Sequence, residues 1–178
     1  ANQEYYKVLE EIKQYETPEL HHQLQSVIVQ LESDYFKGSL FKLGKQILRE
    51  LLLRNEIFEE EIVSSLRSYI QDHSFIPYDG IYKIFLAGEM RLDSLVSDLI
   101  MILKKEEDLA LEETAKALIK IGTPAVVNAV EEIALHENAY LFTLDILAKI
   151  KSSEAEEALL SLFKETDRID IKTVIADS

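Results

Sequence analysis

Four histidines and a large excess of carboxylates are the side chains that could carry chemistry in this chain. The 178-residue sequence holds 4 His and 33 Asp and Glu against 19 Lys and Arg, and it contains no Cys. Without a thiol, the chain cannot form a disulfide, use a cysteine nucleophile or bind a metal through thiolates. Any metal site would therefore depend on imidazole and carboxylate ligands.

The histidines do not form a recognisable ligand set. His21 and His22 are adjacent, so on a helix their side chains point about 100° apart and are badly placed to share a metal. Neither has a carboxylate at a spacing typical of a metal site. We expect both to be polar surface residues, and we expect no metal and no cofactor.

The carboxylates form several short clusters that helix electrostatics explains. Many of them lie at or near expected helix starts, where the positive end of the helix dipole favours a negative charge. The clustered residues are Glu59, Glu60, Glu61, Glu106, Glu107, Asp108, Glu131, Glu132, Glu154, Glu156 and Glu157. No nucleophile, base and orienting group can be grouped, and no glycine-rich phosphate loop is present. We therefore expect a protein that is not an enzyme.

The charge balance restricts the partners. With a net charge of -14 and a pI near 4.7, the chain repels nucleic-acid phosphates and anionic lipid headgroups. We expect a protein partner that is basic or amphipathic, no nucleic acid and no membrane; self-association is left open. Residues 1–6 do not resemble a signal peptide, and no run reaches the roughly 18 apolar residues that span a bilayer. The expected location is the cytoplasm.

The spacing of apolar residues predicts an all-α fold. Along 40–51, apolar residues recur every three or four positions, which places them on one helical face. No stretch alternates apolar and polar residues for long enough to predict a strand, and the chain has only 5 Gly and 3 Pro. The positioning elements are therefore helices.

These helices are expected to form repeated hairpins. Residues 12–20 and 118–126 share a helix end, a Thr-Pro turn and a new helix, and similar turns recur near Asn55, Glu89 and Ser152. The steps of roughly 29 to 38 residues suit stacked helical hairpins. We expect five hairpins, at 8–31, 39–72, 81–99, 111–136 and 144–162, followed by a terminal helix at 168–178.

Turn residues give local detail to two hairpins. Gly122 is expected to end the first helix in a left-handed conformation, with Thr123 as the cap and Pro124 at the first position of the next helix. Gly88 stands at the corresponding place one hairpin earlier. In the last hairpin, Ser153 and Glu156 could form a capping box.

Through the segment 117–126, with its Ile-Gly-Thr-Pro turn, residues 78–165 resemble HEAT repeats of the short bacterial type. The part before them resembles the family through hairpin periodicity and Thr17-Pro18. The resemblance implies a right-handed α-solenoid of stacked antiparallel hairpins, with about five repeats plus the terminal helix. It also implies a protein-binding scaffold whose second helices line a concave face. We expect one solenoid over 1–178, with a bend near 73–80 between 1–72 and 78–178.

Three enzymatic alternatives occur among HEAT-like proteins. His136 and Glu137 resemble the iron-binding pairs of deoxyhypusine hydroxylases, but those enzymes need several pairs and this chain has one. A HEAT-like DNA-repair glycosylase, or another nucleic-acid enzyme, is disfavoured by the acid excess and the absence of Trp. For a chromophore lyase subunit, no residue points to a tetrapyrrole.

A helical wheel predicts the binding surface. If Val126, Val130 and Ile133 face inward, a polar and mostly acidic face with a few apolar residues lies opposite. Across three hairpins the candidate partner-binding residues are Ser94, Asp98, Met101, Asn128, Glu131, Glu132, Leu135, Glu157, Leu160 and Lys164. The apolar ones suit a groove for a partner's helix or extended segment, and the acidic ones favour a basic ligand. Alternatively, adjacent helices cover Met101, Leu135 and Leu160.

An aromatic group lies around the expected bend. Phe75, Tyr78, Tyr82 and Phe85 are spaced so that they could share one surface. They would either pack the bend between the two halves or form an exposed aromatic anchor.

Overall fold

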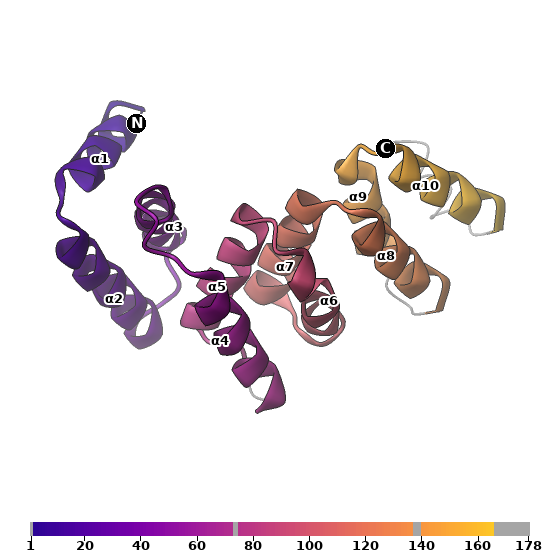
Figure 1. The fold of residues 1–178 in the computed structure, drawn as a ribbon, viewed down its shortest axis with the longest axis horizontal. Helices are drawn as coiled ribbons and strands as arrows, with labels where there is room; N and C mark the ends of the chain where they lie inside the picture. Colours follow the sequence, from indigo (N-terminus) through magenta and orange to yellow (C-terminus); the bar gives the residue numbers. More distant parts are fainter. Residues whose placement is uncertain (1, 73–74, 137–139, 166–178) are drawn as a thin grey trace. The chain divides into compact units, whose positions relative to one another are not determined.

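The computed structural model describes residues 2–72, 75–136 and 140–165, which form helices joined by short turns and loops (Figure 1). The helices are α1 (Asn2–Gln14), α2 (Thr17–Ser33), α3 (Gly38–Leu53), α4 (Glu59–Gln71), α5 (Tyr78–Glu89), η1 (Asp93–Leu95), α6 (Val96–Lys105), α7 (Asp108–Ile121), α8 (Pro124–His136), α9 (Tyr140–Ile150) and α10 (Ser153–Glu165). No strand occurs in the described ranges, so the predicted all-α fold is confirmed. The expected terminal helix at 168–178 lies outside the described residues.

The chain divides into two compact units, residues 1–86 and residues 87–178. The division falls inside α5, a little beyond the segment 73–80 where we expected a bend. Of that segment, residues 73 and 74 lie outside the described part of the chain.

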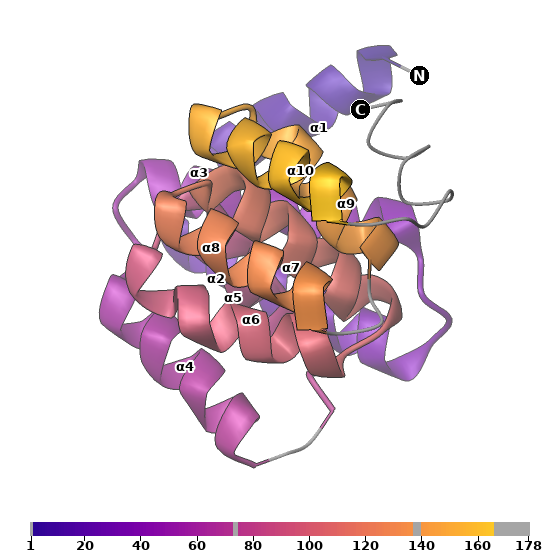
Figure 2. The same cartoon turned by 90° about the vertical axis from the view of Figure 1, so that its right-hand side faces the viewer.

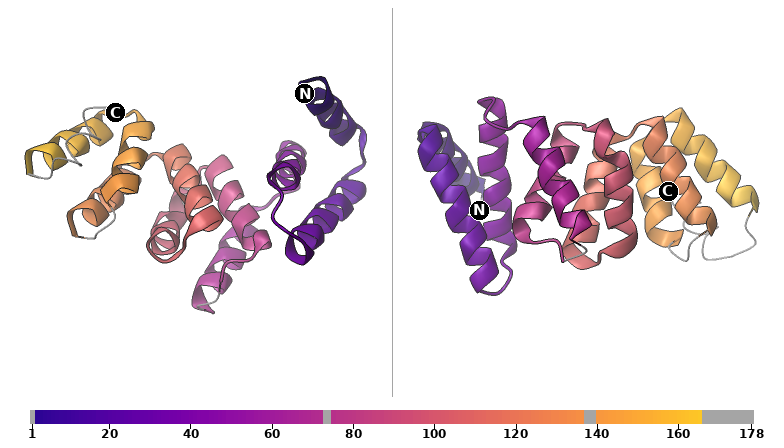
Figure 3. Two further views of the ribbon diagram at one scale, coloured as in Figure 1. Left: turned by 180° about the vertical axis from the view of Figure 1, so that it is seen from behind. Right: turned by 60° about the horizontal axis from the view of Figure 1, so that its bottom comes forward.

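In the first unit, α1 and α2 both pack against α3 (Figure 3). The apolar residues of α2 and α3 recur at helical spacing, so each helix buries one stripe against the other. The buried residues are Leu20, Leu24, Val27, Ile28 and Leu31 on α2, and Phe41, Ile47, Leu48 and Leu51 on α3. The turn between α1 and α2 is tied to α3 by Arg54, whose guanidinium donates to the carbonyl oxygen of Lys13 at 3.1 Å and to the Thr17 hydroxyl at 3.3 Å.

In the second unit, each helix packs against the next helix or the next but one. Helix α6 contacts α7 and α8, α7 contacts α9, and α8 contacts both α9 and α10. Figure 2 shows the consequence: α6, α8 and α10 lie in order, one beside the next. Alternate helices are therefore neighbours within this unit.

Residues in the left-handed conformation lie in the turns before α4, α6, α8 and α10, and one more, Asp108 with a φ of 52°, begins α7. Gly122 has a φ of 57°, as expected of a helix stop, and Asn55, Arg91 and Lys151 take φ values of 59°, 54° and 55°. The prediction that Gly88 matches Gly122 is wrong, because Arg91 takes the left-handed conformation in that hairpin.

Gly88 instead lies inside α5, where the chain needs the smallest side chain. A Cβ at this position would stand 2.8 Å from the Cα of Ala117 on α7. Real Cβ atoms do not approach backbone so closely, so this glycine lets two helices come together within the second unit.

The cap of the last hairpin is shifted by one residue from its predicted place. The hydroxyl of Ser152 accepts a hydrogen bond from the N–H of Ala155 at 3.1 Å, which is the geometry of an N-cap. Ser153 is already the first residue of α10, so the proposed capping box of Ser153 and Glu156 is wrong. Helix α7 also begins at Asp108, earlier than the expected start near Leu111.

Candidate functional site

The predicted partner-binding residues lie on the three neighbouring helices of the second unit. Ser94 belongs to η1, and Asp98 and Met101 belong to α6. Asn128, Glu131, Glu132 and Leu135 lie on α8, and Glu157, Leu160 and Lys164 lie on α10. Because α6 packs against α8 and α8 against α10, these residues lie on adjacent helices of one unit (Figure 2). We call the ten residues the B-helix face.

The buried stripe of α8 explains why these side chains point outward. Val126, Val130 and Ile133 are buried, as the helical wheel predicted. Residues roughly half a turn away on an α-helix must then face solvent. Asn128, Glu132 and Leu135 are accordingly exposed. Helices α6 and α10 also bury one apolar stripe each, so their residues on the opposite side face solvent in the same way.

The three apolar residues of this face are exposed to solvent, and none of them is buried. Met101 is 54% exposed, Leu135 is 40% exposed and Leu160 is 57% exposed. The alternative that adjacent helices bury them is therefore wrong. Large apolar side chains on a polar surface are typical of places where a partner binds, although single ones are also common on ordinary surfaces.

The apolar residues are staggered rather than aligned. The buried residues of η1 and α6 can be matched one to one with those of α8. The pairs are Leu95 with Val126, Val96 with Val127, Leu99 with Val130, Ile102 with Ile133 and Leu103 with Ala134. In this register Met101 corresponds to Glu132, and Leu135 corresponds to Lys104. Between α6 and α8, each of these two apolar side chains therefore has a charged residue at the equivalent place on the other helix, so Met101 and Leu135 form no continuous apolar row.

The charges of the face have both signs. Glu132 and Glu157 are exposed, while Asp98 and Glu131 are half-buried and have interaction partners within the chain. Lys164 is also exposed, near the C-terminal end of α10. The imidazole of His136 lies 3.2 Å from the carboxylate of Glu132, a pair that is charged on both sides only when the histidine is protonated.

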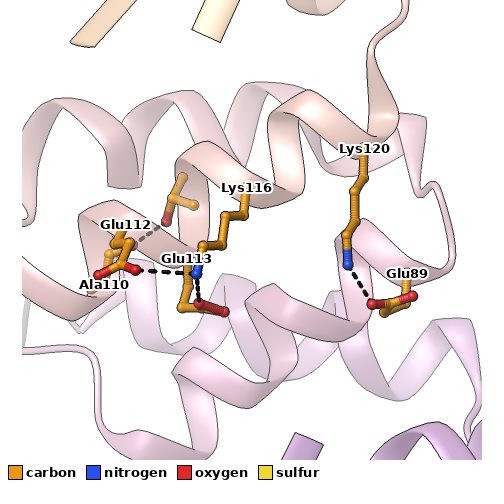
Figure 4. A network of polar contacts seen from close by, with 7 residues as sticks. Glu89, Ala110, Glu112, Glu113, Lys116 and Lys120 are labelled. Atoms are coloured by element: carbon orange, nitrogen blue, oxygen red, sulfur yellow. Dashed lines mark hydrogen bonds and ion pairs between the residues drawn. The ribbon is translucent and has the colours of Figure 1, made fainter. Parts of the chain in front are cut away.

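A second polar group, which the sequence did not single out, lies on α7 (Figure 4). Glu113 is buried, and Lys116 reaches its carboxylate at 3.5 Å and that of Glu112 at 3.1 Å. Burial acts to lower the pKa of Lys116, but its hydrogen bond to Glu112 and the nearby charge of Glu113 outweigh this, so the pKa is raised.

One further contact of this group joins α7 to α5, and another lies within α7. Lys120 on α7 pairs with Glu89 at the end of α5, and the buried hydroxyl of Thr114 donates to the carbonyl oxygen of Ala110 at 2.6 Å. The sequence offered one signal for the ion pairs, which is a lysine three or four residues after each glutamate of α7. Burial of Glu113 could not be read from it.

The predicted aromatic group is divided by the structure. Tyr82 and Phe85 are buried and Tyr78 is half-buried, whereas Phe75 is exposed. Tyr82 stacks on Phe41 of α3 with ring centroids 4.8 Å apart, and its hydroxyl donates to the Phe41 carbonyl oxygen at 3.0 Å. Three of the four residues therefore serve packing within the first unit.

Within the described ranges, the histidines do not belong to a group of side chains that could bind a metal. His21 and His22 are exposed on α2, and Glu137, the partner of His136 in the resemblance to hydroxylases, lies outside those ranges. Over the same residues, no group of three or more His, Asp or Glu side chains could hold a metal ion. None of the described helices combines the length and the apolar character needed to cross a membrane.

Comparison of the chain with protein-family models, with curated proteins and with solved structures finds no significant match.

Proposed function

We propose that this protein is a HEAT-like α-solenoid that binds another protein, without catalysing a reaction, in the cytoplasm. Its binding surface is the B-helix face of α6, α8 and α10. The observation that carries the proposal is the exposure of Met101, Leu135 and Leu160, one on each of three neighbouring helices. Such residues supply apolar contact area on a surface that is otherwise polar.

The packing within the second unit supports the solenoid. In the described part of the second unit, the extensive contacts join each helix to the next helix or the next but one, as expected where hairpins stack in a row. The recurrence of a left-handed residue at Asn55, Arg91, Gly122 and Lys151 supports the same repeated unit. A hairpin of this size cannot bury its own apolar face, so stability would come from stacking between neighbours.

The partner that suits this face is a basic or amphipathic segment. Its apolar side chains would contact the staggered Met101, Leu135 and Leu160, and its basic residues would lie near the exposed Glu132 and Glu157. The exposed Lys164 would favour an acidic residue at one end of the segment. The net charge of -14 disfavours a nucleic-acid enzyme, the alternative to this proposal.

A charge-reversal variant tests this proposal. Glu132→Lys combined with Glu157→Lys changes two exposed residues of the face, and Glu60→Lys combined with Glu61→Lys makes the same change on the exposed start of α4. Asp98 and Glu131 are less suitable, because they are half-buried and their replacement could disturb packing. Each variant is coupled to a resin, incubated with native lysate and compared with the parent by quantitative mass spectrometry.

The proposal expects a defined set of proteins to be retained by the parent and by the α4 variant, and lost by the variant in the B-helix face. Equal recovery of the same proteins by all three would contradict it.

A further inference from the structure

Two aromatic side chains of the first unit are almost fully exposed. Tyr35, in the loop between α2 and α3, is 87% exposed, and Phe75, in the loop before α5, is 85% exposed. Phe36, next to Tyr35, is 48% exposed. Rings of this size are costly to leave in water, and at protein interfaces aromatic residues are enriched.

The two loops meet at one end of the first unit. The ring of Phe36 stacks on that of Tyr78, the first residue of α5, with centroids 6.3 Å apart and an interplanar angle of 5°. Tyr35 precedes Phe36 directly, and Phe75 shortly precedes Tyr78. We call Tyr35, Phe36, Phe75 and Tyr78 the aromatic loop cluster.

Ring faces in this unit already bind cations of the chain itself. The ammonium of Lys45 lies 5.0 Å from the ring centroid of Phe41 and 5.1 Å from that of Phe85, and Arg49 lies 5.1 Å from the Phe85 centroid. Phe36 continues the same row, because its ring is 5.9 Å from that of Phe41. A cation over an aromatic face is stabilised by the negative charge of the π system.

Carboxylates accompany the exposed rings. The carboxylate of Asp34 accepts a hydrogen bond from the N–H of Tyr35 at 2.8 Å, and this bond, with the nearby Lys37, lowers the pKa of Asp34 and keeps it ionised. Glu32 and Asp72 are exposed on the same two loops or the helix ends beside them. The local charge is therefore negative, with Lys37 the basic residue on the first of these loops.

We propose that the aromatic loop cluster binds a protein segment rich in arginine and lysine. Guanidinium groups would lie over Tyr35 and Phe75, and neighbouring cations would pair with Asp34, Glu32 and Asp72. This goes beyond the proposed function, because the surface belongs to the first unit and shares no residue with the B-helix face. It would be a second site with its own ligand chemistry.

A short synthetic peptide of alternating arginine and glycine is the probe, labelled with a fluorophore and titrated with the full-length chain. Fluorescence anisotropy at physiological salt measures its affinity for the parent and for Tyr35→Ser combined with Phe75→Ser. Losing two exposed cation–π contacts should weaken binding about tenfold. Circular dichroism and thermal melting should be unchanged, because both side chains are solvent-exposed.

Two control variants separate binding at the aromatic loop cluster from binding elsewhere on the chain. Val29→Ser combined with Leu53→Ser removes exposed apolar residues of the same unit outside the cluster, and it should bind as the parent does. Met101→Ser combined with Leu160→Ser changes the B-helix face and should also leave peptide binding unaltered. If the parent and the variant with Tyr35→Ser and Phe75→Ser bind the peptide with equal affinity, the net charge of the chain alone attracts the peptide. That result would overturn the inference. Loss of binding only in the Met101 and Leu160 variant would overturn it as well, while leaving the proposed function in place.

Discussion

Gly44 of α3 lies directly against the hydroxyl end of Tyr82 of α5, with no room between them for a side chain. A Cβ at Gly44 would overlap the hydroxyl oxygen and the ring carbon that bears it. Tyr82 cannot easily move away, because it is buried, stacked on Phe41 and hydrogen-bonded to the Phe41 carbonyl oxygen. The approach of α3 and α5 in the first unit therefore depends on this glycine.

Gly44→Ala should destabilise the protein, although alanine is the better helix former. Helix propensity alone would stabilise by about 1 kcal/mol, but forcing an extra methyl group into a packed site costs about 1–3 kcal/mol and would displace the Tyr82 hydroxyl. Urea unfolding should show a lower free energy of unfolding for Gly44→Ala than for the parent. The loss should shrink in a Tyr82→Phe background, where the overlapping oxygen is gone; an unchanged penalty there would show that the two residues are not coupled.

Arg54→Ala should destabilise the first unit by about 1–3 kcal/mol, since charged hydrogen bonds to the end of α1 and to the start of α2 are lost. The guanidinium donates to the Lys13 carbonyl oxygen and the Thr17 hydroxyl while it pairs with Glu50 at 3.5 Å. Arg54→Lys should recover only part of the lost stability, because a lysine ammonium cannot donate in several fixed directions at once as the planar guanidinium does.

The matched control for Arg54 is Lys13→Ala, which removes the exposed ion pair of Lys13 with Glu10. Such a pair contributes little, so urea unfolding should scarcely change. A loss in Lys13→Ala as large as that in Arg54→Ala would argue against the special role of the guanidinium.

The environment of Tyr69 leads us to expect a loss of stability at alkaline pH. Burial, together with the hydrogen bond that its hydroxyl donates to Asp79 at 2.7 Å, raises the pKa of Tyr69 from 10.0 to about 12. The folded state thus holds this proton more tightly than the unfolded state. The stabilisation is fully present below about pH 10 and is lost as the pH rises from about 10 to 12.

The measurement is the difference in melting temperature between the parent and Tyr69→Phe across that pH range. The amount by which the parent melts at a higher temperature than Tyr69→Phe should be constant near neutral pH and should fall above about pH 10. An advantage that does not change with pH would contradict the assignment. Subtracting the variant removes the contribution of the other tyrosines and of the lysines.

Leu135→Ala and Ile133→Ala compare two apolar residues of α8 that face opposite ways. Ile133 is buried, so its truncation should cost about 2–5 kcal/mol. Leu135 is partly exposed, so its truncation should cost less than about 1 kcal/mol in urea unfolding. A similar cost for both would place Leu135 in the core and remove it from the binding surface.

Helical periodicity was enough to predict the elements, because apolar spacing directly reflects which side of a helix is buried. The left-handed stop at Gly122 was also predictable, since a glycine followed by Thr-Pro combines the residue that favours a helix end with those that favour a new helix start. Gly88 could not be interpreted in this way. A glycine can end a helix or admit a close neighbour, and only the position of Ala117 decides between the two.

The same misassignment affected the candidate site. Matching Gly88 with Gly122 placed Met101 opposite Leu135, whereas the buried stripes place Met101 opposite Glu132. The left-handed residues Arg91 and Gly122 are separated by as many positions as the buried residues Leu95 and Val126, so the register follows the helix stop at Arg91 and not Gly88. That Met101, Leu135 and Leu160 are on the surface followed from the helical wheel. Their staggered arrangement depended on which residue takes the left-handed conformation at the end of α5, and periodicity does not determine that position.

The most direct test of the proposed function uses Met101→Ser combined with Leu160→Ser. Native lysate is passed over the parent, this variant, and Val29→Ser combined with Leu53→Ser, which alters residues of the first unit that are at least as exposed. Once quantitative mass spectrometry identifies a retained protein, its affinity for all three is measured by calorimetry. We predict that binding weakens at least about tenfold in the Met101 and Leu160 variant alone. Equal affinity of all three for every retained protein would contradict the assignment of the B-helix face as the binding surface.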